Sequence, residues 1–105
     1  MEWVYQCRNL DEVRTQIDSL DRAIVSMIAH RGLYVQQAAA FKHSDAEVED
    51  GKRVDQVMRR VTRLAGELGA DAALTAKIYR TMIAHFIESE REERLRLVGT
   101  REARA

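Results

Sequence analysis

The sequence predicts an all-α fold with three helices per chain, one of them very long, assembled as a homodimeric helical bundle. Pro is absent and Gly occurs only 5 times in 105 residues, which argues against a turn-rich β fold. Apolar residues recur at spacings of three and four along most of the chain, the period of an amphipathic helix. The length of the first helix is the observation that predicts the dimer.

The first predicted helix runs from about Asn9 to Phe41, and Asn9 with Glu12 has the spacing of a capping box. At about 1.5 Å per residue this helix is roughly 50 Å long. A compact domain of this size has a radius of gyration of about 13 Å. A monomer would leave the apolar stripe of the helix in water, so we expect an obligate homodimer. The stripe consists of Leu10, Val13, Ile17, Leu20, Ile24 and Met27.

The polar, acidic segment 43–51 predicts a loop. Asp50 at its end is a good N-cap for a short second helix from Gly51 to about Leu68. Gly69 supplies a natural stop for that helix.

Asp71 is the predicted N-cap of a third helix, which we expect to be of medium length. We expect residues 1–105 to form a single domain, because a chain of this length builds one core. Residues 1–8 and 98–105 lack a clear period, and we expect them to be frayed.

Basic and acidic residues balance at 17 each, so net charge favours neither a nucleic-acid nor a membrane partner. The single Cys7 excludes an intrachain disulfide and fits a reducing compartment. The N-terminal residues do not resemble a signal peptide, and no apolar run approaches the roughly 18 residues of a membrane span. We therefore expect a cytoplasmic protein.

Three cations, Arg14, Arg31 and Lys42, lie on or near the apolar stripe of the first helix. A buried cation is costly unless an anion neutralises it, so the three predict a pocket for an anion. On a straight helix, Arg31 and Lys42 share one face about 16 Å apart, whereas Arg14 lies some 25 Å from Arg31. We therefore expect the far end of a second copy's helix to supply Arg14.

Two further charges fall where a ligand site needs them. Arg53 lies three residues past the Asp50 cap, at a helix N-terminus whose free amides attract anions. Glu90 follows Ile83 by seven residues and Phe86 by four, so it falls on the apolar stripe of the third helix and faces inward.

Each of these charges also has an explanation without a ligand, and only the joint pattern favours a site. Lys42 suits the C-terminus of a helix through the macrodipole. Ordinary ion pairs would explain the rest: Arg14 with Asp18, Arg31 with a core acid such as Asp21, Arg53 with Asp50 or Glu49, and Glu90 with Arg91 or Arg94.

The runs VRTQIDSLDRAIVSMIAHR (13–31), AAAFK (38–42) and DGKR (50–53) resemble the all-helical, type II chorismate mutase family over roughly residues 9–95. The family hallmark is an Arg, a second Arg seventeen residues later and a Lys eleven after that, which Arg14, Arg31 and Lys42 match. Within the family, the chain is most similar to the isochorismate-pyruvate lyase branch, which shares the pairs Phe41-Lys42 and Tyr34-Val35.

The resemblance implies an intertwined homodimeric helical bundle with two equivalent sites, each taking Arg31, Lys42 and Arg53 from one subunit and Arg14 from the other. Arg14 and Arg31 would bind the two carboxylates of chorismate or its isomer, and Lys42 would donate to the ether oxygen. The reactions are pericyclic: the enzyme folds the substrate into its reactive shape and stabilises charge growing on the ether oxygen. The resemblance therefore implies no cofactor and no metal.

The chain departs from the mutase pattern at three positions. Val54 replaces an acid that binds the ring hydroxyl, and Phe86 replaces a Ser, as in the lyase branch. Glu90 replaces a Gln that donates to the ether oxygen, and an ionised carboxylate can only accept. We therefore expect activity to be higher in mild acid than at pH 8. Lys42 and Glu90 are the expected catalytic residues, and the expected substrate-binding set is Arg14, Arg31, Lys42, Asp50, Arg53, Val54, Phe86 and Glu90.

Conversion of chorismate to prephenate is the function we expect first, because the cationic triad defines the family. Isochorismate-pyruvate lyase activity, giving salicylate and pyruvate, is the runner-up. Val54, Phe86 and Phe41 favour the lyase, whereas segment 43–51 lacks the Pro-containing stretch of that branch. Rearrangement of amino-deoxychorismate and a non-catalytic helical dimer that binds a dicarboxylate or a partner helix are the remaining hypotheses.

Overall fold

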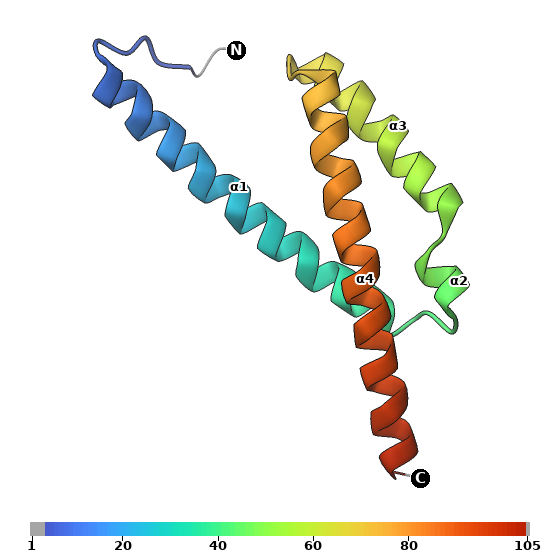
Figure 1. Cartoon of the computed structure of the whole chain (residues 1–105). Coiled ribbons are helices and arrows are strands. Elements are labelled where there is room, and N and C mark those ends of the chain that lie inside the picture. The colour runs from blue at the N-terminus through green and yellow to red at the C-terminus, as the bar shows by residue number, and fades with distance from the viewer. Residues whose placement is uncertain (1–3, 105) are drawn as a thin grey trace. The chain divides into compact units, whose positions relative to one another are not determined.

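The computed structural model describes residues 4–104, with side chains described for residues 4–99 (Figure 1). The described part is all-α and contains no strand, as predicted. The chain divides into two compact units, Met1–Tyr34 and Val35–Ala105, which are considered separately. The elements in order are α1 (Leu10–Ala39), α2 (Asp45–Val48), α3 (Gly51–Leu68) and α4 (Ala72–Arg104).

Helix α1 begins where the sequence predicts. Asn9 Oδ1 accepts a hydrogen bond from the backbone N–H of Glu12 at 2.9 Å, which confirms the cap. Glu12 Oε2 accepts from the backbone N–H of Arg8 at 2.8 Å rather than from that of Asn9. In the usual capping box the Glu side chain accepts from the N–H of the N-cap residue itself. Here it accepts from the residue before the N-cap.

Helix α1 ends at Ala39, so the prediction of helix as far as Phe41 was too long. The backbone N–H groups of Ala40, Phe41 and Lys42 each donate to the carbonyl three residues earlier, at 3.0 to 3.3 Å. Such bonds tighten the chain into a turn and end the α-helix. Lys42 therefore lies beyond the end of the helix, and the straight-helix geometry assumed for it does not extend that far.

The predicted apolar stripe of α1 is exposed along its whole length in the described structure. The exposed fractions in the stripe run from 39% for Val13 to 65% for Met27. Single apolar residues commonly face water, but a continuous exposed apolar stripe of this length is typical of an interaction surface. The stripe supports the prediction of a dimer, which itself stays a prediction.

In the second unit, α3 and α4 run antiparallel and are joined by a tight turn (Figure 1). Gly69 ends α3 in the left-handed conformation, with φ of 77°, as predicted from its position. The N–H of Ala70 donates to the carbonyl of Ala65 at 2.8 Å. Asp71 Oδ1 then accepts from the N–H of Leu74 at 2.9 Å, which confirms the predicted cap of α4.

The core of the second unit lies between α3 and α4. Val57 and Val61, one turn apart on α3, are buried against Ile83 of α4. Burying an aliphatic side chain of this size stabilises the folded state by about 1.5–3 kcal/mol. The partly buried residues packed around this cluster are Val54, Met58, Tyr79 and Ile87.

Helix α4 is the longest element, with 33 residues, so the prediction of a medium-length third helix was wrong. It continues through 98–104, where we expected fraying, and residues 4–8 have no regular structure. The predicted loop 43–51 contains the one-turn helix α2, which sequence reasoning missed. In the described part of the chain, no helix has both the length and the apolar character needed to cross a membrane.

Candidate active site

Lys42 and Glu90 form the ion pair at the centre of the candidate site. Lys42 Nζ lies 2.8 Å from Glu90 Oε1. Glu90 is 5% exposed and is the only buried charged residue among those with described side chains, whereas the side chain of Lys42 is 27% exposed. A buried carboxylate needs a cationic partner, and Lys42 provides it. The inward orientation predicted for Glu90 is therefore confirmed.

The contact between Lys42 and Glu90 is electrostatic rather than a well-aligned hydrogen bond. The two atoms are close, but Glu90 Oε1 has no partner with hydrogen-bond geometry in the described structure. An ammonium group carries three N–H donors. Lys42 therefore keeps directed donors for a further acceptor while its charge is held by Glu90.

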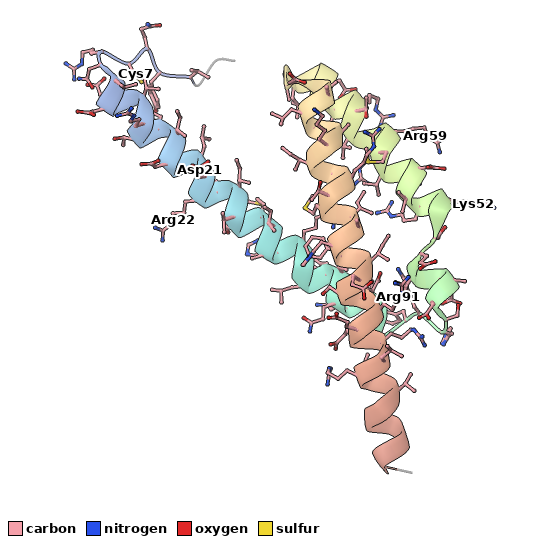
Figure 2. The ribbon with its side chains drawn as sticks, in the orientation of Figure 1. Cys7, Asp21, Arg22, Lys52, Arg59 and Arg91 are labelled. Atoms are coloured by element: carbon pink, nitrogen blue, oxygen red, sulfur yellow. The ribbon has the colours of Figure 1, made fainter. Side chains whose placement is uncertain are left out.

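The ion pairs of Glu90 with Arg91 or Arg94, which the sequence left open, are not the ones the structure forms. Arg91, which is labelled on α4 in Figure 2, pairs with Glu49 and, at 3.0 Å, with Glu88. Arg94 Nη2 lies 2.6 Å from Asp45 Oδ1. Both arginines thus engage acids outside the Lys42–Glu90 pair.

One turn after Glu90, a second acid on α4 has a surface partner. Glu93 accepts hydrogen bonds from Nε and Nη2 of Arg96 at 3.0 and 2.6 Å. These bonds and the charge of Arg96 lower the pKa of Glu93 below its ordinary value, with a smaller contribution from Gln36, against the raising effect of burial. The same pairing raises the pKa of Arg96. Glu93 is therefore held ionised by neighbours other than Lys42.

The start of α3 carries three of the predicted binding residues. Asp50 Oδ1 accepts from the N–H groups of Lys52 and Arg53 at 3.1 and 3.2 Å, which confirms its role as a cap. The exposed side chain of Arg53 donates from Nη1 to Gln56 Oε1 at 2.6 Å rather than to Asp50 or Glu49.

Val54 and Phe86 are half-buried in the second unit. Val54 packs against the core cluster of α3 and α4. Phe86 precedes Glu90 by one helical turn, which places both on one face of α4. The ring of Phe86 meets that of His85 edge-on, with centroids 5.9 Å apart. At position 54, where the mutase pattern has an acid, this chain therefore has an apolar side chain that contributes to the core.

Arg14 and Arg31 belong to the first unit, on α1. Arg14 is exposed, and the structure shows no ion pair between it and Asp18, although both side chains are described. Arg31 is half-buried. The approach of either arginine to Lys42 and Glu90 stays a prediction.

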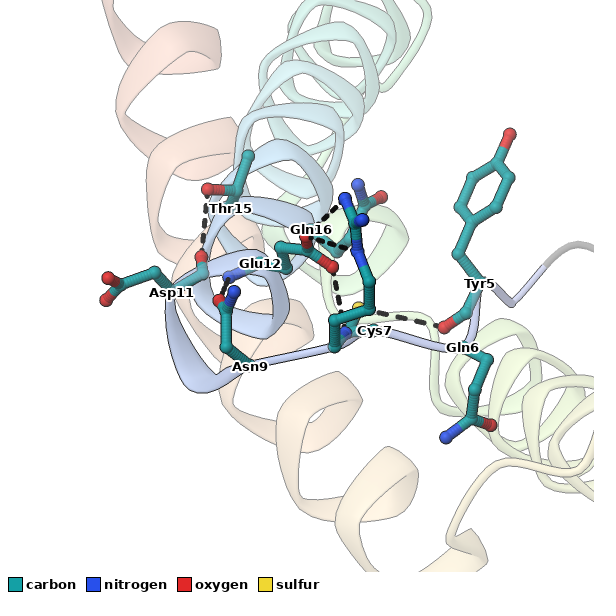
Figure 3. Close-up of a pocket in the computed structure, with 9 residues that line it drawn as sticks. Tyr5, Gln6, Cys7, Asn9, Asp11, Glu12, Thr15 and Gln16 are labelled. Atoms are coloured by element: carbon teal, nitrogen blue, oxygen red, sulfur yellow. Dashed lines mark hydrogen bonds and ion pairs between the residues drawn. The ribbon is translucent and has the colours of Figure 1, made fainter.

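An open hollow at the N-terminal end of α1 contains none of the predicted site residues (Figure 3). The Arg8–Glu12 ion pair and the Asn9 cap shape it. Within the described residues, no cluster of three or more His, Cys, Asp or Glu side chains could hold a metal ion. The lining residues are Tyr5, Gln6, Cys7, Arg8, Asn9, Asp11, Glu12, Thr15 and Gln16.

Similarity to known proteins identifies the family to which this chain belongs. The model of the type II chorismate mutase family matches residues 13–91, most of the chain. This chain belongs to the type II chorismate mutase family. The membership predicted from the spacing of Arg14, Arg31 and Lys42 is confirmed, and every predicted site residue lies in the matched range. Isochorismate pyruvate lyase of Pseudomonas aeruginosa is 31% identical over 84 residues, which cover 80% of this chain and 83% of that protein.

Sequence reasoning missed the acids that attach α2 to α4, Asp45 and Glu49. A local signal for α2 was present, because Ser44 and Glu47 have the spacing of a capping box. Nothing in the linear sequence, however, pairs Asp45 with Arg94, 49 residues away.

Proposed function

We propose that this member of the type II chorismate mutase family is an isochorismate pyruvate lyase. The observation that carries the proposal is the Lys42–Glu90 pair, an ammonium group with free donors fixed beside a buried carboxylate. Cleavage of an enolpyruvyl ether needs such a donor where negative charge grows on the ether oxygen. The choice of isochorismate is supported by Val54, by Phe86 and by the Pseudomonas relative.

In the proposed reaction, the ether C–O bond breaks as a hydrogen moves from the ring to the methylene carbon of the enolpyruvyl group. The products are pyruvate and aromatic salicylate, with no atom gained or lost. Lys42 donates a hydrogen bond to the ether oxygen as the bond breaks. The remaining requirement is to hold the flexible substrate folded, which is a proximity effect.

Arg14 and Arg31 are the proposed ligands of the two substrate carboxylates, because guanidinium groups bind carboxylates through two parallel hydrogen bonds. In this proposal the site takes Arg14 from a second copy of the chain, in an intertwined homodimer. The exposed apolar stripe of α1 supports the dimer, since a second copy would cover it. Asp50 and Arg53, at the start of α3, are the remaining polar residues of the proposed site.

Chorismate mutase activity is the second candidate, and the family match itself favours it. The cationic triad, taken alone, also favours this activity, which is why we expected it first from the sequence. We place it second because the relative that covers most of the chain is a lyase and because position 54 lacks an acid for the ring hydroxyl.

Incubation of the purified protein with isochorismate and, separately, with chorismate tests the proposal. We expect salicylate and pyruvate in equal amounts from isochorismate. Lys42→Met should lower kcat by about 100-fold or more, the size of losing one donor to a developing oxyanion. Lys77→Met, which removes an exposed lysine of α4, is the control and should leave the rate unchanged. Prephenate from chorismate alone would favour the mutase, and no product from either substrate would contradict both enzymes.

A further inference from the structure

The segment that joins α1 to α3 meets α4 through three ion pairs, and two of these have opposite polarity. Lys42 of the segment meets Glu90 of α4, and Asp45 of the segment meets Arg94 of α4. In the first pair the segment supplies the cation, and in the second it supplies the anion.

The alternating charges define how the segment lies along α4. Glu90 and Arg94 are one turn apart on α4, about 6 Å along the axis. A slip of the segment by one turn would bring Lys42 to Arg94 or Asp45 to Glu90. Like charges at contact distance repel, so the electrostatics favour the observed register.

Helix α2 depends on α4 for its place, since four residues cannot form a stable helix alone. Ser44 Oγ accepts from the N–H of Glu47 at 3.2 Å, and Glu47 Oε2 accepts from the N–H of His43 at 2.7 Å. These local bonds shape the turn but do not attach it to another element. Attachment to α4 comes from the ion pairs and from Val48, which is 3% exposed.

Arg94 is the more buried of the two arginines that hold α2. Its side chain is 16% exposed and its Nε has no hydrogen-bond partner in the described structure. Arg91, whose side chain is 26% exposed, pairs with Glu49 at the other end of α2. A partly desolvated arginine depends on its acid more than a surface arginine does, because water compensates less for its loss.

We propose that Arg94, supported by Arg91, is a positioning residue for Lys42: by holding α2 on α4, it keeps the ammonium group beside Glu90. Asp45 follows Lys42 by only three positions, so loss of the second pair frees the chain that carries the first. The consequence for catalysis rests on the proposed function. The positioning itself is a property of the protein without substrate.

Competitive acetylation of the lysines measures this positioning directly. The chain has three lysines, and Lys52 and Lys77 are exposed internal references. With trace acetic anhydride and peptide mass spectrometry, we expect Lys42 to label more slowly than both references. Arg94→Gln and Asp45→Asn should each raise Lys42 labelling relative to Lys77 by about threefold or more, as loss of a contributing ion pair predicts.

The double variant Arg94→Gln/Asp45→Asn should label no faster than the faster single variant, because both changes remove one interaction. Arg94→Lys, which keeps the charge, should retain most of the protection. Arg63→Gln is the matched control, since it removes an exposed ion pair with Glu67 on α3 and should leave Lys42 labelling unchanged.

Unchanged Lys42 labelling in both folded single variants would overturn the proposal, whatever the enzyme activity. If Arg94→Gln does not fold, Lys42 labelling in Asp45→Asn tests the proposal by itself. Asp45 is exposed and lies outside α4, so we expect this variant to fold. In activity assays, Arg94→Gln should lower kcat more than it changes KM. A wild-type protein that converts neither substrate would refute the proposed function and leave the labelling result on Arg94 intact.

Discussion

Glu90 places a negative charge within contact distance of the ammonium group that the proposed reaction uses. The carboxylate keeps Lys42 in place, but it also opposes negative charge that develops nearby and the approach of a dianionic substrate. Gln, the residue usual in the family at this position, is neutral and donates hydrogen bonds. At the scale of single residues, the proposed function therefore gives Glu90 the role of placing Lys42, with less transition-state stabilisation than Gln would provide.

Glu90→Gln should raise kcat at pH 8 by about tenfold, the effect of one improved donor at the ether oxygen. Steady-state rates at pH 8 measure the effect. Glu92→Gln, a change in an exposed acid of α4, is the control. An unchanged or lower kcat in Glu90→Gln would contradict the role assigned to Glu90.

At the scale of elements, the hairpin of α3 and α4 depends on the left-handed residue between them. Gly69 has φ of 77°, and a Cβ added there meets no atom within 4 Å, so any cost of a side chain comes from the backbone alone. Gly69→Ala should lower the free energy of unfolding by about 1–2 kcal/mol. Chemical denaturation measures the change.

Gly66 offers a matched control inside α3, because a Cβ added there also meets no atom within 4 Å and the backbone is helical. Gly66→Ala should raise the free energy of unfolding by about 0.5–1 kcal/mol. The same substitution three residues apart should thus have opposite signs. Equal effects at both positions would contradict the left-handed cap.

At the scale of the whole molecule, the proposed dimer depends on the apolar stripe of α1. Ile24 lies in the stripe and is 55% exposed. Ile24→Glu should convert the protein to a monomer in sedimentation and abolish activity, because the charge would be buried between the copies. Ser26→Glu adds the same charge on the opposite face of α1 and should leave a dimer. A wild-type protein that sediments as a stable monomer would refute both the dimer and the shared site.

The caps and the local periodicity could be predicted because both depend on neighbours in the sequence. Asn9, Asp50, Gly69 and Asp71 act at the predicted helix ends, and the inward orientation of Glu90 followed from its spacing to Ile83. The length of α4 was missed, since its last turns have no apolar period to mark them. The end of α1 was missed too, because no breaker residue follows Ala39.

The sequence by itself determined the all-α class, the family and the identities of the charged residues. The tertiary structure decided which opposite charges meet: Lys42 with Glu90 and Asp45 with Arg94, rather than Glu90 with its neighbours on α4. The physical reason is the distance along the chain over which each interaction acts. Capping bonds and helical periodicity act within one or two turns, whereas the choice of an ion-pair partner depends on which elements pack together, and many distant acids and bases match equally well on paper.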